Sequence, residues 1–172
     1  ELPLGDPDSV MSAPDLAARE GLLAVGFTVE TGGYHRPHVS MGDSVGTLGE
    51  PLAVPTGTPV THSTGVRVAL DPGVDGPVHV LWSGYTVLMA TYDIAGGAFG
   101  DPVEVLDDTS WGPHIAPSLA AGTGGTVHLA WVDGDRPVPT TMLRTIVPHM
   151  GPSVVSQVPT TGTSSSPALA FA

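Results

Sequence analysis

The feature that most constrains the fold of this chain is an internal repeat of about 51 residues. Each repeat opens with a turn, then a proline or glycine, then a short strand of alternating apolar residues. Taking Pro14, Gly65, Pro117 and Pro167 as equivalent gives successive spacings of 51, 52 and 50 residues. Periods in this range are typical of folds in which each repeat forms one supersecondary unit. The chain is therefore expected to fold as successive copies of one unit.

Each period contains the same four apolar segments in the same order. The opening strand is followed by a second strand that ends in an aromatic residue, a third strand after a polar turn, and a short fourth strand after a Gly-rich link. The second strands are 22–27, 78–82 and 127–131, the third 36–41, 86–92 and 140–147, and the fourth 51–54, 102–105 and 153–156. Short apolar runs separated by tight turns indicate antiparallel meanders. Second strands that are apolar on both faces fit a sheet sandwiched between two neighbours.

The sequence therefore predicts an all-β fold, a portion of a β-propeller with three four-stranded antiparallel blades and partial flanking blades. The inner strands are predicted at Leu16, Val68, Leu119 and Leu169. The predicted division is an outer strand of a preceding blade with its link over 1–12, blades over 13–62, 63–114 and 115–164, and an inner strand over 165–172. Propellers typically contain about four to eight blades. We therefore expect further blades from a longer chain, from further copies in a homo-oligomer, or from a partner chain. An immunoglobulin-like β-sandwich is the alternative fold.

The composition limits the partners that this chain can bind. Seventeen acidic residues stand against five arginines and no lysine, which gives a formal net charge of −12. Such a chain cannot neutralise a phosphate backbone, so no nucleic-acid binding is predicted. No apolar run is long enough to cross a bilayer, so no membrane span is predicted. The absence of cysteine excludes disulfides and thiol chemistry. We expect an extracellular location for the mature form.

The third repeat resembles a known group of proteins. Residues 117–121 read Pro-Ser-Leu-Ala-Ala, and residues 122–134 read Gly-Thr-Gly-Gly-Thr-Val-His-Leu-Ala-Trp-Val-Asp-Gly. This run is similar to the first two strands of blades in sialidase-like and related lectin-like β-propellers. The resemblance covers most of the chain as a blade pattern and implies architecture, since one fold hosts many functions. The sialidase signature Ser-x-Asp-x-Gly-x-x-Trp does not occur in the sequence, so the resemblance identifies no catalytic residue here.

Two histidines occupy equivalent positions before an inner strand. His62 and His114 each lie three residues before the start of a repeat, where a propeller link enters the innermost strand at one mouth of the central channel. Two imidazoles that converge on the channel axis could hold a transition-metal ion or an anionic ligand. The other equivalents are Met11 and Ser164, so the alternative is that each histidine caps its own turn. No other cofactor is predicted.

The links between the second and third strands open on the same predicted face as His62 and His114. They carry carboxylates, an arginine and an aromatic residue: Glu30, Tyr85, Asp133, Asp135 and Arg136. Such groups on a concave face are typical of sites for sugars and other polar ligands. The alternative is that each is a solvated turn residue. We expect a ligand on this face, because the opposite face offers Gly-rich links such as Gly96–Gly97 and Gly124–Gly125.

Two further pairs of histidines are interpreted as structural. His79 and His128 each precede the tryptophan of a second strand by three residues, among apolar neighbours. We expect a buried, neutral imidazole that bonds to the next blade, since buried polar groups are normally satisfied. His35 and His38 are three residues apart on an extended strand, which sends their side chains to opposite faces. They are not predicted to form a site.

Two classes of function remain open. No nucleophile elbow of the Gly-x-Ser-x-Gly kind and no His-Glu-x-x-His helix occurs in the sequence. The favoured hypothesis is a non-catalytic β-propeller binding module that recognises a glycan or protein partner on its loop face. The alternative is a fragment or subunit of a propeller hydrolase or lyase, such as a sialidase-like glycosidase. That enzyme would need an acid, a base or a metal set supplied from outside these three repeats.

Overall fold

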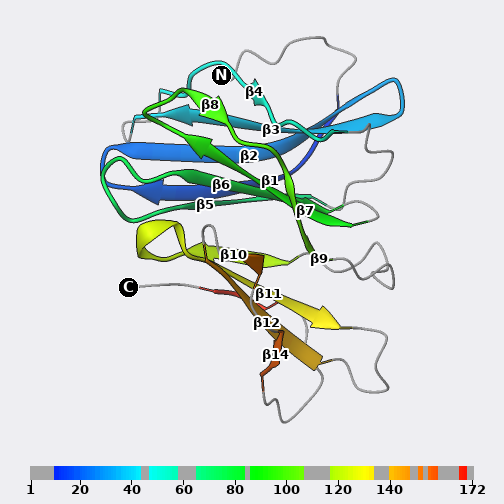
Figure 1. The fold of residues 1–172 in the computed structure, drawn as a ribbon. Coiled ribbons are helices and arrows are strands. Elements are labelled where there is room, and N and C mark those ends of the chain that lie inside the picture. Colours follow the sequence, from blue (N-terminus) through cyan, green and yellow to red (C-terminus); the bar gives the residue numbers. More distant parts are fainter. Residues whose placement is uncertain are drawn as a thin grey trace.

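The computed structural model describes residues 10–43, 47–57, 65–83, 86–106, 117–133, 140–147, 151–152, 155–158 and 167–169. These residues form three antiparallel sheets joined by turns, so the predicted all-β class is confirmed. Each sheet is built from one repeat, in the order in which the repeats follow along the chain (Figure 1).

The first sheet is a meander of four neighbouring strands. Its strands are β1 (Val10–Arg19), β2 (Leu22–Thr31), β3 (Tyr34–Gly42) and β4 (Leu52–Ala53). β1 begins three residues before the predicted start of the blade and contains Pro14. The strand accommodates this proline because its register with β2 shifts between Ser12 and Asp15, and such bulges tolerate a residue without an N–H. Gly32 and Gly33, both at positive φ, close the tight β2–β3 hairpin.

The second and third sheets repeat this meander. The second contains β5 (Val66–Leu70), β6 (Val78–Ser83), β7 (Val87–Asp93), β8 (Ala98–Phe99) and β9 (Val103–Leu106). The third contains β10 (Ser118–Ala121), β11 (Val127–Asp133), β12 (Thr140–Val147), β13 (Gly151–Pro152) and β14 (Ser156–Gln157). A 3₁₀ turn, η1 (Thr123–Gly125), joins β10 to β11.

The outer edge of these two sheets differs from the prediction of four strands per blade. β8 and β9 both pair with β7, and β13 and β14 both pair with β12, so each of these sheets has five strands. In the second sheet Pro102 separates β8 from β9. A proline cannot donate to the ladder, which explains why this edge strand is split.

The first strands of the three sheets lie where the sequence predicted inner strands. Leu16, Val68 and Leu119 face Val25, Val80 and Leu129 across the first ladder of each sheet. The three central residues are therefore structurally equivalent, at spacings of 52 and 51 residues. Leu169, the predicted centre of a fourth inner strand, lies among the described residues 167–169, which belong to none of the named strands.

The second sheet lies between the other two and is buried on both faces (Figure 1). On β6, Val78, Val80 and Trp82 pack into a cluster shared with the first sheet, whereas Leu81 packs into a cluster shared with the third. Gly26 lets the first sheet approach closely, since a Cβ at this position would lie 2.6 Å from Val68 Cγ1. The apolar character of both faces of the second strand thus follows from its central position.

The inner segments of successive repeats are hydrogen-bonded to one another. The backbone N–H of Val68 donates to Asp15 Oδ2 over 2.8 Å. Arg67 Nε donates to the carbonyl oxygen of Pro117 over 3.0 Å. The backbone N–H of Leu169 donates to Ser118 Oγ over 3.0 Å. The partners are 53, 50 and 51 residues apart, close to one repeat period each time.

Candidate functional site

Most of the loop-face site predicted from sequence lies outside the described residues. This applies to His62, Tyr85, His114, Asp135 and Arg136, and therefore to the predicted metal pair His62 and His114. Asp133 is described as the last residue of β11, without its side chain. The loop-face site accordingly stays a prediction.

Glu30 is the predicted site residue whose side chain the structure describes. It lies within β2, paired with Val10 on one side and His35 on the other, and is half-buried. The sequence placed it in the link after the second strand. That placement is wrong because the hairpin turn consists of Gly32 and Gly33 alone, so the strand continues through Glu30 to Thr31.

A polar groove runs where the inner segments of the four repeats meet. Its volume is about 280 Å³. It is lined by Asp15, Leu16, Arg67, Val68, Pro117, Ser118, Leu119, Pro167 and Leu169. The carboxylate of Asp15, the guanidinium of Arg67 and the hydroxyl of Ser118 each bond to a neighbouring repeat. These polar groups therefore hold the repeats together.

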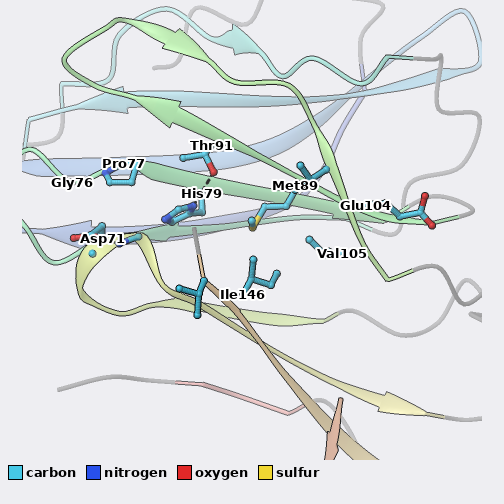
Figure 2. A pocket seen from close by; sticks show the side chains of 13 residues that line it. Asp71, Gly76, Pro77, His79, Met89, Thr91, Glu104, Val105 and Ile146 are labelled. Atoms are coloured by element: carbon cyan, nitrogen blue, oxygen red, sulfur yellow. Dashed lines mark hydrogen bonds between the residues drawn. The ribbon is translucent and has the colours of Figure 1, made fainter. Parts of the chain in front are cut away.

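A larger cavity lies between the second and third sheets (Figure 2). It encloses about 770 Å³. The β5–β6 turn supplies Asp71, Gly76 and Pro77, and η1 supplies Gly124 and Gly125. The walls come from β6, β7, β9 and β12: His79, Met89, Thr91, Val103, Glu104, Val105, Ile146 and Val147. We call this cavity the intersheet pocket.

His79 is the buried titratable group of the intersheet pocket. It lies on β6 directly opposite Thr91 of β7, with its Nδ1 3.1 Å from Thr91 Oγ1 (Figure 2). The residue is 3% exposed, and its Nε2 has no hydrogen-bond partner among the described residues. The expectation of a bond to the next blade is wrong, because the threonine opposite it in its own sheet satisfies Nδ1. The expectation of burial is confirmed for His79, whereas His128, for which it was also made, is only half-buried.

The electrostatics of the intersheet pocket keep His79 uncharged. Desolvation by burial lowers the pKa of His79 from 6.5 to about 4, although the negative charge of Asp71 acts in the opposite direction. The imidazole is therefore neutral near pH 7. A neutral imidazole carries one donor and one acceptor nitrogen.

Asp71 fixes the turn end of the intersheet pocket. Its carboxylate is buried and accepts two backbone N–H groups, from Gly73 over 2.8 Å and from Gly125 over 2.5 Å. The Arg19 guanidinium, at the end of β1, donates to the carbonyl oxygens of Asp71 and Gly73. The first and third sheets are therefore both hydrogen-bonded to the β5–β6 turn at this point.

The remaining walls are mostly apolar. Met89, Val105 and Ile146 are buried, and Val103 is 50% exposed at the opening. Glu104 is exposed at the side away from Asp71 (Figure 2). Apolar walls with a few fixed polar groups are typical of pockets for small molecules. Among the described residues, no cluster of three or more His, Asp or Glu could hold a metal ion.

The third sheet repeats the His–Thr pair of the second. His128 faces Thr145 across the β11–β12 ladder, with Nδ1 and Oγ1 3.1 Å apart. Its neighbours Val127 and Leu129 pack toward the second sheet, so alternation places His128 on the opposite face. The same pair therefore lines the intersheet pocket in one repeat and faces away from it in the next.

Sequence reasoning missed the intersheet pocket because it depends on how two sheets pack. From the sequence, few polar side chains were expected to converge on the face opposite the loop face, where Gly124 and Gly125 lie. In the structure Gly125 meets Asp71, whose sequence separation from it is 54 residues. The available signal was the equivalence of His79 and His128, together with the acidic turn that precedes His79.

Comparison of the sequence with protein-family models finds no matching family, and comparison with curated proteins finds no match.

Within the described residues, no helix has the length and apolar character needed to cross a membrane.

Proposed function

We propose that this chain is a portion of a β-propeller and acts as a non-catalytic binding module for a glycan or protein partner on its loop face. The observation that carries this proposal is the set of hydrogen bonds between inner segments one repeat period apart.

Contacts between equivalent positions are what a radial arrangement requires. In a propeller each inner strand has the inner strands of the preceding and following blades as neighbours. Val68 meets Asp15, Arg67 meets Pro117, and Leu169 meets Ser118, so the order in space follows the order in sequence. Further blades, from a longer chain, further copies or a partner chain, would continue the series beyond the third sheet.

The use of the polar groups in the groove favours binding over catalysis. Asp15, Arg67 and Ser118 converge where a propeller has its channel, and each is engaged in a bond that joins two repeats. A catalytic acid or base must be free to exchange a proton with the substrate. A rigid scaffold with its variable links at one end is instead suited to recognition. The proposed module would act outside the cell, in line with the lectin-like blade pattern.

A glycan array probed with the purified chain tests this proposal. A glycan that binds should lose most of its affinity for the double variant His62→Ala, Asp133→Ala, while the melting temperature stays nearly unchanged. Asp75→Ala is the matched control, because Asp75 is an exposed acid in the β5–β6 turn at the opposite end of the sheets. Binding that persists in the double variant, or that Asp75→Ala abolishes, would show that the loop face is the wrong choice.

A further inference from the structure

We propose that the intersheet pocket binds a small, neutral, largely apolar molecule that carries a hydroxyl group. This site is distinct from the loop face, and its walls come from two described sheets. It therefore does not depend on the completion of a ring or on the proposed recognition of a glycan or protein.

The size and walls of the intersheet pocket fit such a molecule. Its volume of about 770 Å³ lies within the range of roughly 300 to 1,000 Å³ that is usual for small-ligand sites. Met89, Val105 and Ile146 supply apolar surface from both sheets. Burial of an apolar ligand against these side chains would provide most of the binding free energy.

His79 supplies the reason for the hydroxyl group. Its Nδ1 lies 3.1 Å from Thr91 Oγ1, and its Nε2 is buried with no partner in the part of the chain that the structure describes. His79 lines the intersheet pocket, and buried polar atoms in proteins are normally hydrogen-bonded, so its unpartnered nitrogen indicates a place for a ligand atom. Whether Nε2 is a donor or an acceptor depends on the tautomer. A hydroxyl group satisfies both cases, because it can donate or accept.

The charges around the intersheet pocket argue against an ionic ligand. A ligand carboxylate beside His79 would be repelled by the Asp71 carboxylate. Asp71 is close enough to raise the pKa of the imidazole, against the larger effect of desolvation. An ammonium group would have to leave water for apolar walls, and the Asp71 oxygens already accept the N–H groups of Gly73 and Gly125. A neutral hydroxyl avoids both costs.

Three naphthalene probes of similar shape test the proposal in calorimetric titrations at pH 7. They are 2-naphthol, 2-methylnaphthalene and 2-naphthoate. We expect 2-naphthol to bind about tenfold more tightly than 2-methylnaphthalene, which is the usual effect of one buried hydrogen bond. The carboxylate of 2-naphthoate should make it the weakest of the three.

Two variants and a matched control locate the effect. His79→Phe keeps a ring of similar size and should abolish the preference for 2-naphthol over 2-methylnaphthalene. His128→Phe removes the equivalent imidazole of the third sheet, which faces away from the intersheet pocket, and should preserve the preference. Val103→Trp, at the half-exposed opening, should weaken all three probes by filling the space.

Ring-nitrogen NMR of His79 provides a readout that needs no variant. Addition of 2-naphthol should shift the Nε2 resonance, and 2-methylnaphthalene should shift it far less. The proposal is overturned if none of the probes binds, if 2-naphthol shows no preference, or if the preference survives His79→Phe. None of these outcomes affects the glycan measurements, because the pocket variants change no residue of the proposed loop face.

Discussion

At the scale of single residues, His79 shows how burial sets the charge of a side chain. The imidazole is 3% exposed and its pKa is lowered to about 4 by desolvation, against the opposing effect of Asp71. Near pH 7 it is a neutral hydrogen-bonding group between Thr91 and the intersheet pocket. Within the described ranges no group bonds to its Nε2, and this nitrogen is the one that the proposed ligand would contact.

The lowered pKa of His79 predicts a pH-dependent stability. Below about pH 6.5, His79 binds a proton in the unfolded chain but stays neutral in the folded chain. The free energy of unfolding therefore falls as the pH falls, until the pH passes below about 4 and the folded chain binds the proton as well. The loss should be about 2 kcal/mol at pH 5 relative to pH 7. His79→Phe should lack this component. Urea denaturation of both proteins at pH 7 and pH 5 measures it, and equal losses in the two proteins would contradict the assignment.

At the scale of elements, the β5–β6 turn acts as the junction between sheets. The Asp71 carboxylate binds its own turn through Gly73 and the third sheet through Gly125. Arg19 joins the first sheet to the same turn. Hydrogen bonds to a buried charged group contribute more than bonds between neutral groups. The turn therefore contributes to the packing of all three sheets.

Removal of this carboxylate should destabilise the fold. We expect Asp71→Ala to lower the free energy of unfolding by about 2 to 4 kcal/mol, because the N–H groups of Gly73 and Gly125 lose their acceptor and the second of these bonds is buried. Asp93→Ala is the matched control. Asp93 also accepts the N–H of the residue two positions later, from Ala95 over 3.0 Å, but it is exposed and bonds to no second sheet within the described residues. It should cost less than about 1 kcal/mol. Chemical denaturation distinguishes the two, and equal effects would contradict the junction role.

The elements themselves were predictable because they depend on local patterns repeated along the chain. The period placed Leu16, Val68 and Leu119 at the centres of equivalent strands, and their ladders confirm it. The split outer strands were not predicted, since β8 is two residues long and gives almost no apolar signal. Glu30 was misplaced because a two-glycine hairpin is shorter than the polar link that the sequence suggested.

The intersheet pocket could not be predicted for a different reason. Its rim joins Asp71 to Gly125 and its walls join β6 to β12, so it depends on the packing of sheets that are distant in sequence. Periodicity fixes which face of a strand is apolar. Periodicity does not predict whether two apolar faces pack without gaps or leave a cavity between them, because that depends on side-chain volumes across the interface.

At the scale of the whole molecule, the three sheets stack one after another, in contrast to a sandwich of two sheets. The second sheet is buried on both faces. On the third sheet, Val127, Leu129 and Trp131 face the second sheet. His128 and Ala130 lie on its other face. They are equivalent to His79 and Leu81, which lie on the face of the second sheet that the third sheet covers. In the proposed propeller, the next blade would pack on the face of the third sheet that carries His128.

Sedimentation velocity combined with thermal melting of the 172-residue chain tests the propeller account most directly. Burial of one more sheet face of several hundred Å² would contribute on the order of 10 kcal/mol before the entropy of association is subtracted. A portion of a propeller should sediment as an assembly of more than one chain, or as a single chain that melts without a sharp transition until further blades are supplied. A soluble monomer of 17.4 kDa with one sharp melting transition would contradict it.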